Sequence, residues 1–334
     1  MYRKKKCLIA NRYYWHNNRP MKTTWTTANI PSQLGRRVVI TGSNSGIGFE
    51  AALALARHGA ELILPARTKA KAENAVARIL EQVPNAQLHP EILDLATQAS
   101  VRAFAERVIE RFPGQSLDLL IHNAGVMALP TRELTADGFE RQFATNYLGA
   151  FALTGLLLPS IRQEPGSRIV TVSSSASKQG KIEFDNLQSE RVYKPMFQAY
   201  AQSKLADLIF TQELQRRLKS VGSPILSTAA HPGYAVTNLQ ADHVGTGLKI
   251  LMAVMKPFLS QDAARGALPT LYAAVAAEAV PGGYYGPDGI AELKGYPTAV
   301  PLPKNALDLA IAKRLWEESE RLTGVNFGAL SEAA

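Results

Sequence analysis

A glycine-rich turn between an apolar strand and a helix is the feature that most constrains this chain. Val38-Val39-Ile40 leads into Thr41-Gly42-Ser43-Asn44-Ser45-Gly46-Ile47-Gly48, and a helical pattern of apolar residues begins there. In a parallel α/β sheet this arrangement presents backbone N–H groups and a helix N-terminus to a phosphate. The glycine spacing is neither the common dinucleotide fingerprint nor a Walker loop, since no Lys-Ser or Lys-Thr follows it. Alone, it predicts either a phosphate site or a plain tight connection.

Short apolar stretches alternate with helical patterns along the chain. We expect strands at 61–66, 87–93, 117–122, 168–173 and 225–230, and helices at 47–58, 69–82, 97–112, 137–158 and 197–220. Such alternation predicts a doubly wound parallel sheet with helices on both faces, which is a Rossmann-type, three-layer α/β/α fold. No linker or composition break follows residue 36, so a single domain is expected over 37–330.

The formal charge of +9 comes from the start of the chain. Residues 1–37 hold nine basic and no acidic residues, and removing nine from 37 leaves 28 basic against 28 acidic residues elsewhere. A neutral body has no general reason to bind nucleic acid. We expect 1–36 to be a basic extension, disordered at least to residue 20, with translation starting naturally at Met21. Contact of this tail with anionic lipid or RNA is the alternative.

The cellular setting is predicted from cysteine and apolar content. The single Cys7 precludes an intrachain disulfide and suits a reducing cytoplasm. No apolar run approaches the roughly 18 residues of a membrane span, although peripheral membrane contact is left open. Residues 239–259 are apolar and contain methionine, which fits either a lid over a lipophilic substrate or an ordinary packed helix. No metal site is expected.

Tyr200 and Lys204 are four residues apart and therefore share one face of a helix. An ammonium group there favours the phenolate, which makes the tyrosine a usable proton donor or acceptor near neutral pH. Alone, such a pair is mostly a surface coincidence. Ser173, Ser174 and Ser175 end a predicted strand at the sheet edge where parallel sheets hold ligands, although serines there also form turns and caps.

In combination, these motifs resemble the short-chain dehydrogenase/reductase family over roughly residues 21–330. The order and approximate spacing of motifs that are weak individually carry the resemblance: Thr41–Gly48, Asn123-Ala124-Gly125, Asn146, Ser174, Tyr200 with Lys204, and Pro232-Gly233-Tyr234-Ala235-Val236-Thr237. The stretch from Arg168 to Glu190, with the 26-residue gap from Ser174 to Tyr200, is similar to the retinol-dehydrogenase-like and WW-domain-oxidoreductase-like branch.

The resemblance implies a role for each motif residue. Tyr200 is expected to be the catalytic acid/base, and Lys204 its electrostatic partner and the anchor of the nicotinamide ribose. Ser174, with Ser173 as the fallback, is expected to donate a hydrogen bond to the substrate carbonyl, and Asn146 to support a water that links Lys204 to solvent. The implied cofactor contacts, besides Tyr200 and Lys204, are Gly42, Ser43, Asn44, Ser45, Gly46 and Ile47 at the pyrophosphate, Asp94 and Leu95 at the adenine, Asn123, Ala124 and Gly125 along the cofactor, and Pro232, Gly233 and Thr237 at the nicotinamide.

The end of the second strand indicates which cofactor binds. An acidic residue there would bind the ribose hydroxyls of NAD and repel a 2′-phosphate, whereas arginine attracts that phosphate. The sequence has Arg67, so NADP(H) is predicted and NAD(H) is the less favoured cofactor. The alternative is that Arg67 is only a solvated loop cation.

Two residues depart from the family pattern. His122 stands where an asparagine often precedes Asn-Ala-Gly, and Pro65 lies inside a strand although it cannot donate to the ladder. Neither touches the proposed proton chemistry. We expect His122 and His231 to be structural or cofactor-side residues.

The sequence therefore predicts an NADP(H)-dependent enzyme that interconverts an alcohol and a lipophilic aldehyde or ketone, and the resemblance implies a homo-oligomer. One alternative is an enzyme similar to light-dependent protochlorophyllide reductase, but that family depends on an active-site cysteine, which Cys7 cannot supply. The other is a non-catalytic NADP-binding sensor. Such a protein tends to lose its tyrosine or lysine, and this chain retains both.

Overall fold

A computed structural model of the chain describes residues 24–234 and 261–332. Thr237 and the apolar segment 239–259 lie outside the described residues, as do residues 1–23. The described chain forms one eight-stranded sheet in the order β3-β2-β1-β4-β5-β6-β7-β8. The strands are β1 Arg37–Ile40, β2 Glu61–Ala66, β3 Leu88–Ile92, β4 Leu119–His122, β5 Arg168–Val172, β6 Leu226–Ala230, β7 Tyr284–Pro287 and β8 Pro297–Ala299.

The pairing of the strands confirms the doubly wound fold. All pairs from β3 to β7 are parallel, and only β8 runs antiparallel, against β7. The chain first builds the sheet outward from β1 through β2 to β3, and then returns to place β4 on the other side of β1. The carboxyl edge between β1 and β4 is thus the topological switch point, where such sheets bind ligands.

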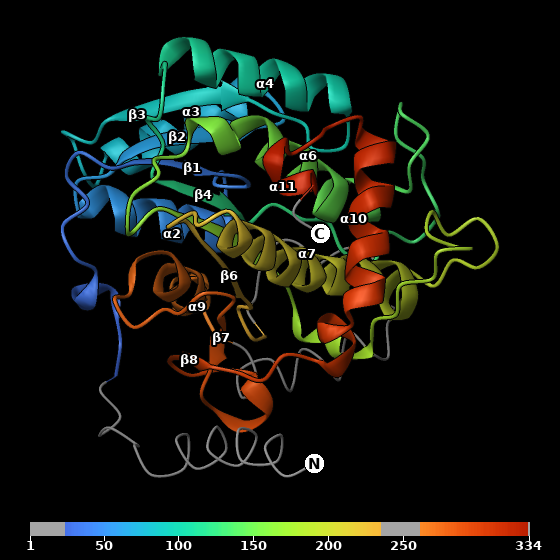
Figure 1. Cartoon of the computed structure of the whole chain (residues 1–334). Coiled ribbons are helices and arrows are strands. Elements are labelled where there is room, and N and C mark those ends of the chain that lie inside the picture. The colour runs from blue at the N-terminus through green and yellow to red at the C-terminus, as the bar shows by residue number, and fades with distance from the viewer. Residues whose placement is uncertain (1–23, 235–260, 333–334) are drawn as a thin grey trace.

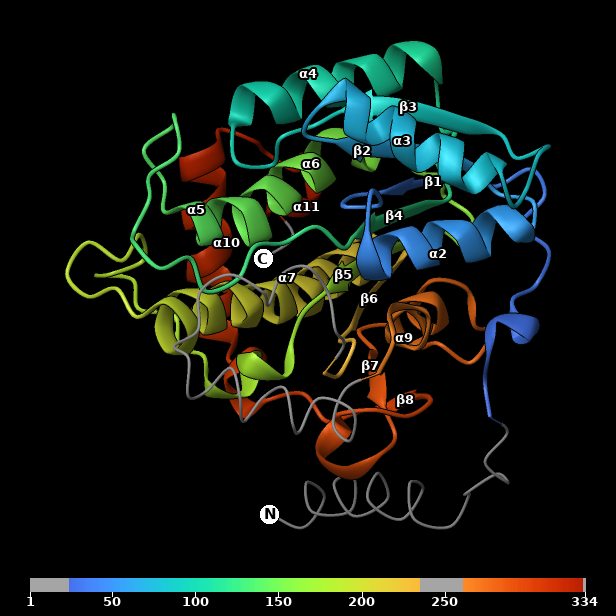
Figure 2. The ribbon, with the colours of Figure 1, turned by 180° about the vertical axis from the view of Figure 1, so that it is seen from behind.

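Helices cover both faces of the sheet (Figure 1). One face carries α2 Gly46–Arg57, α3 Lys69–Leu80 and α9 Ala263–Val275. The opposite face carries α4 Gln98–Arg111, α6 Gly149–Leu157 and α7 Ala201–Ser220, with α10 Leu309–Thr323 and α11 Ala329–Glu332 packed outside them. In the reverse view of Figure 2, α2 and α3 lie in front and α10 lies behind. No helix or strand was expected after residue 262, so α9, β7, β8, α10 and α11 are additions.

Two expected helices are interrupted. The helix expected from 137 begins only at α5 Arg141–Phe143, because Glu140 caps it by accepting hydrogen bonds from the N–H groups of Gln142 and Phe143. A π-helical segment, Ala144–Leu148, then joins α5 to α6, and a second one, Pro195–Tyr200, precedes α7. Such wide turns often occur at functional sites, and these two carry Asn146 and Tyr200.

Pro65 is accommodated in β2 without loss of a sheet hydrogen bond. The N–H of Glu61 donates to the carbonyl oxygen of Arg36, on the side of β2 that faces β1. Backbone N–H groups two residues apart in a strand point to the same side, so the nitrogen of Pro65 also faces β1. The paired residues of β1 and β2 end at Val39 and Ile63. The missing N–H therefore falls just beyond the ladder.

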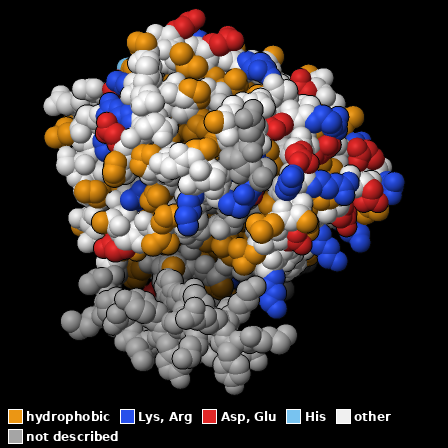
Figure 3. Space-filling view, viewed as in Figure 1, with side chains coloured by type: hydrophobic (Ala, Val, Ile, Leu, Met, Phe, Trp, Pro, Cys, Tyr) orange, Lys and Arg blue, Asp and Glu red, His pale blue; other side chains and the backbone are white. Residues whose placement is uncertain are grey.

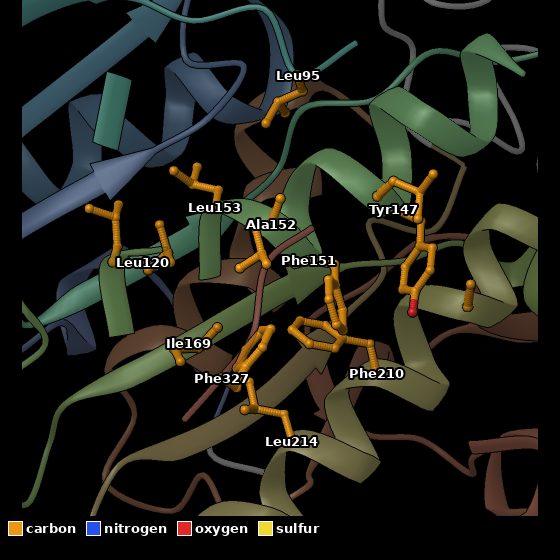
Figure 4. Packing of buried hydrophobic residues seen from close by; sticks show 14 of the residues in the cluster. Leu95, Leu120, Tyr147, Phe151, Ala152, Leu153, Ile169, Phe210, Leu214 and Phe327 are labelled. Carbon is orange, nitrogen blue, oxygen red and sulfur yellow. The ribbon is translucent and has the colours of Figure 1, made fainter. Parts of the chain in front are cut away.

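The larger core lies between the sheet and α4, α6 and α7. In it, Phe151 contacts Trp316 and Phe327 with ring centroids 5.2 and 4.8 Å apart, which fastens the C-terminal helices onto α6 (Figure 4). The second core, on the opposite face, includes residues from before β1. Trp25 is 8% exposed and meets Tyr272 of α9 edge-on at 5.4 Å, so residues of the expected extension pack on the folded body.

Charged side chains of both signs intermingle on the surface. Figure 3 shows basic and acidic groups mixed along one side of the viewed face, with apolar side chains scattered between them. Oppositely charged neighbours of this kind form short-range pairs on the surface, such as Arg321 with Glu318 in α10.

Candidate active site

A cavity of about 460 Å³ opens at the carboxyl ends of β1, β2, β4 and β5. It brings together most of the residues singled out from the sequence, which are far apart along the chain. Those lining it are Gly42, Asn44, Ser45, Gly46, Ile47, Arg67, Asp94, Leu95, Asn123, Ala124, Gly125, Ser173, Tyr200, Lys204 and Pro232. Ser43, Asn146, Ser174 and Gly233 are not among its lining residues, and Thr237 lies outside the described residues.

The glycine turn forms the floor of one end of this cavity. Gly42 and Gly46 have φ of +69° and +57°, a conformation that side chains rarely adopt. At Gly48 a Cβ would overlap the carbonyl of Gly42 and the amide of Asn123. That amide donates to the carbonyl oxygens of Thr41 and Gly42, at 3.0 and 3.3 Å, and so fixes the turn against the loop after β4.

The end of α2 beside this turn fits the pyrophosphate of a dinucleotide. Ser45 precedes the helix but makes no capping hydrogen bond with its side chain. The N–H groups of the first turn have no partner within the helix and carry the positive end of its dipole. Ser43, in contrast, has its hydroxyl buried and without a partner in the described structure, so it is a less suitable contact than its neighbours.

Basic side chains lie at the end of β2, where the adenosine of a bound dinucleotide is expected. Arg67 is exposed and lines the cavity together with Lys71 of α3. Within the described ranges no carboxylate forms an ion pair with Arg67. Asp94 lines the same cavity. One of its carboxylate oxygens accepts a hydrogen bond from the N–H of Ala96 at 3.0 Å, which stabilises the loop after β3.

Tyr200 and Lys204 reach the cavity from the start of α7. The ammonium Nζ of Lys204 donates to the carbonyl oxygen of Val172 and to Oδ2 of Asp207, both at 2.8 Å. Burial by itself would lower the pKa of Lys204, but the Asp207 carboxylate outweighs it and the pKa is raised. The lysine is therefore a fixed positive charge at this end of the cavity.

Ser173 and Ser174 have different hydrogen-bond states. Ser173 is buried, and its hydroxyl donates to the carbonyl of Lys204 at 2.7 Å, so its proton is already used. Ser174 is partly exposed, and its oxygen accepts from the N–H of Ala176 at 3.2 Å. Among the described residues no acceptor takes its hydroxyl proton, which supports the choice of Ser174 over Ser173.

Asn146 ties the loop after β4 to α7. Its amide donates to Val126 and to the hydroxyl of Ser203, each at 2.9 Å, and its oxygen accepts from the N–H of Val126 at 2.7 Å. The space above Gly125 is bounded by Asn146 and by the ammonium of Lys204. Asn146 therefore lies beside the lysine but positions backbone rather than lining the cavity.

His122 is a structural residue, as expected. Thr154 donates its hydroxyl proton to Ala150, so the 2.7 Å contact between Thr154 and His122 has the Nε2–H of the imidazole as its donor. Burial lowers the pKa of His122 to about 3, which keeps the ring neutral. His231 is likewise buried and meets Glu292 at 3.0 Å.

Several lining residues were missed from the sequence. Met127, Leu129, Glu133, Arg141 and Thr145 also line the cavity, and Glu133 pairs with Arg141 at 2.8 Å. Met127, Leu129 and Glu133 come from the loop after β4, which has no periodicity and so offered no signal in the sequence. Arg141 of α5 and Thr145 of the following π-helical segment lie within the expected helix, but its apolar pattern does not show that they face the cavity. Asp207 was also missed, although its position three residues after Lys204 is itself a helical-neighbour signal.

The comparison with protein families agrees with this geometry. A family model described as short chain dehydrogenase matches residues 36–246, which is more than half of the chain. The chain belongs to the short-chain dehydrogenase family. Members of this family bind nicotinamide cofactors.

Curated relatives place this short-chain dehydrogenase in the retinol-dehydrogenase-like branch, as the resemblance implied. Retinol dehydrogenase 13 of Homo sapiens is 40% identical over 311 residues, which cover 91% of this chain and 88% of that protein. Polyprenol dehydrogenase of Mus musculus is 37% identical over 305 residues, covering 90% and 87% of the two chains. These relatives make the chain an oxidoreductase of alcohols and carbonyls.

Solved structures confirm the fold. An uncharacterized protein from Mycobacterium paratuberculosis superposes with a TM-score of 0.75 at 40% identity, covering 91% of this chain and 99% of that one. A short chain dehydrogenase from Burkholderia cenocepacia, solved in complex with NADP, gives a TM-score of 0.59 at 26% identity and covers 76% and 96%.

The expected cytoplasmic location is wrong. The relatives are dehydrogenases of retinol and polyprenol, which are long-chain lipid alcohols that partition into membranes, and this points against a purely cytoplasmic enzyme. The single cysteine bears only on redox conditions and says nothing about membrane association. Among the described helices, none is long and apolar enough to cross a membrane.

Proposed function

We propose that this dehydrogenase interconverts a lipophilic alcohol and its aldehyde or ketone with NADP(H), using Tyr200 as the acid/base. The observation that carries the proposal is that Tyr200 and Lys204 line the same cavity as the Gly42–Ile47 turn. The turn and the uncapped start of α2 would hold the cofactor pyrophosphate. NADP(H), when bound, would supply or accept the hydride.

The protein's own groups account for the proton. In carbonyl reduction the phenolic oxygen of Tyr200 donates a proton to the developing alkoxide, and in alcohol oxidation it accepts that proton. The Lys204 ammonium stabilises the phenolate that forms. The free hydroxyl proton of Ser174 orients the substrate oxygen toward Tyr200. Asn146 holds the loop at Val126 and the hydroxyl of Ser203, which keeps both walls of the site in place.

Arg67 is proposed to select NADP(H) by pairing with the 2′-phosphate. Its lack of a carboxylate partner among the described residues and the nearby Lys71 support this role. Replacing Arg67 with Asp should weaken NADPH binding by roughly tenfold to a hundredfold, because a charge-assisted hydrogen bond is worth about 1.5–3 kcal/mol. The affinity of Arg67→Asp for NADH should equal or exceed that of the wild type. Arg57→Asp, at the opposite end of α2, is the matched control, and equal NADPH affinity in wild type and Arg67→Asp would reject the role.

The substrate class is proposed from the relatives, whose names specify retinol and polyprenol. The test is a screen of purified protein in detergent micelles, following NADPH absorbance with retinal, polyprenals, steroid ketones and short water-soluble aldehydes. Turnover that rises with chain length supports the proposal. NADPH binding without turnover of any alcohol or carbonyl would instead indicate a cofactor sensor. The homo-oligomeric state expected from the resemblance stays a prediction.

A further inference from the structure

Asp207 is a buried carboxylate that the chemistry described so far does not use. It lies one turn after Lys204 in α7, and its side chain is 1% exposed. Its Oδ2 accepts from the Lys204 ammonium at 2.8 Å, whereas Oδ1 has no hydrogen-bond partner in the described structure. A buried carboxylate is costly unless it is paired, so Asp207 and Lys204 depend on each other.

The pair also determines where the lysine points. An ammonium group has three N–H donors, and in Lys204 two of them are taken by Val172 and Asp207. The described residues offer the third N–H no further acceptor within hydrogen-bond distance, and Lys204 lines the cavity. Asp207 therefore helps to hold the ammonium between α7 and the end of β5.

We propose that Asp207 is the counter-ion of Lys204: it positions the ammonium group and offsets part of the positive charge that acts on Tyr200. The inference rests on the proposed role of Tyr200 as the acid/base. Asp207 is a positioning residue in this scheme, because it reaches the reacting atoms only through Lys204.

The ionisable groups around Asp207 and Lys204 determine the charge state of this pair. Burial raises the pKa of Asp207 to about 6, even though Lys204 lowers it. The other ionisable groups that act on the pair are Tyr200, which faces Lys204, and Tyr147 of the first π-helical segment, which faces Asp207. Tyr147 does not donate a hydrogen bond to Asp207. Ser319 donates its hydroxyl proton to the carbonyl oxygen of Leu315, so in its contact with Tyr147 the serine oxygen accepts the tyrosine proton.

The direction of the effect follows from the signs of the charges. The ammonium of Lys204 favours the phenolate of Tyr200, and the carboxylate of Asp207 opposes this at slightly longer range. Without the carboxylate charge, the Lys204 ammonium stabilises negative charge on the Tyr200 oxygen more strongly. The acid limb of the pH profile for alcohol oxidation should then move to lower pH.

The test compares wild type with Asp207→Asn, which keeps an oxygen for the ammonium but removes the charge. In kcat/KM for alcohol oxidation, the acid limb should move down by about one pH unit. The KM for NADP⁺ should stay within about twofold, because Asp207 does not line the cavity. If Asp207→Asn does not fold, Asp207→Ser also removes the charge and carries the same prediction.

Glu213→Gln is the matched control. Glu213 is also a buried carboxylate of α7 and pairs with Arg217 at 2.7 Å, but neither lines the cavity. This variant should lower stability and leave the pH profile in place. An unmoved acid limb in the folded Asp207 variant, or an equal shift in Glu213→Gln, would overturn the inference. A wild-type enzyme without turnover would instead refute the proposed function, so the two failures are distinguishable.

Discussion

His122 makes a specific contribution to the pH dependence of stability. Its imidazole is fully buried, donates through Nε2 to Thr154, and leaves Nδ1 without a partner in the described structure. Burial lowers the pKa of His122 from its usual 6.5 to about 3. The unfolded chain therefore binds a proton at His122 between these two pH values, and the folded chain does not. Stability should fall as pH decreases through this window.

The size of this effect follows from the pKa difference. At pH 5 the unfolded histidine lies about 1.5 units below its pKa, and each unit corresponds to about 1.4 kcal/mol. Protonation of His122 should therefore lower the free energy of unfolding by about 2 kcal/mol between pH 7.5 and pH 5. His122→Gln removes the titrating group and keeps an amide donor for Thr154, so the loss over this range should shrink by that amount.

The assay is urea unfolding at pH 7.5 and pH 5, followed by tryptophan fluorescence. Any constant cost of the substitution cancels, because each protein is compared with itself at the two pH values. His58→Gln, at the partly exposed end of α2, is the control and should retain the contribution of His122. Equal losses in wild type and His122→Gln would refute the reasoning.

Two further substitutions test other parts of the structure. Trp25→Ala should lower the free energy of unfolding by about 3 kcal/mol, because the side chain is buried against Tyr272; an unchanged thermal midpoint would show that residues before β1 are not part of the folded body. Gly48→Ala should weaken NADPH binding more than tenfold, since a Cβ would displace Gly42 or Asn123 and deform the turn. Fluorescence titration with NADPH, with circular dichroism to verify folding, measures this, and wild-type affinity in a folded variant would contradict it.

Most strands and helices between residues 37 and 230 were predictable because each carries its own local pattern. The strands expected at 61–66, 117–122 and 225–230 all occur, with ends that differ by at most two residues. The alternation of strands with helices predicted parallel pairing, and parallel pairing in turn predicted the sheet edge at which the candidate residues gather.

What could not be predicted depends on contacts between distant residues. The π-helical segments at Asn146 and Tyr200 keep the apolar positions of a helix, so hydrophobic periodicity does not distinguish them from α-helix. The burial of Trp25 depends on α9, more than two hundred residues later. Similarly, the hydroxyl of Ser173 is committed to Lys204 only because β5 and α7 lie side by side.

The location was mispredicted for a different reason. The absence of a long apolar run in the sequence was combined with the presence of a single cysteine, and neither property reports on the substrate. The finding that overturned the expected location is the similarity of the chain to dehydrogenases named for retinol and polyprenol.

Turnover and cofactor binding in Tyr200→Phe test the central claim most directly. The substitution removes only the phenolic oxygen, which the account makes the proton donor and acceptor. NADPH affinity should stay within about twofold of wild type, since the glycine turn and Arg67 are untouched. Turnover of the best substrate from the screen should fall by at least about a hundredfold, the usual contribution of a positioned acid/base. Tyr200→Phe that binds NADPH and retains wild-type turnover would contradict the account.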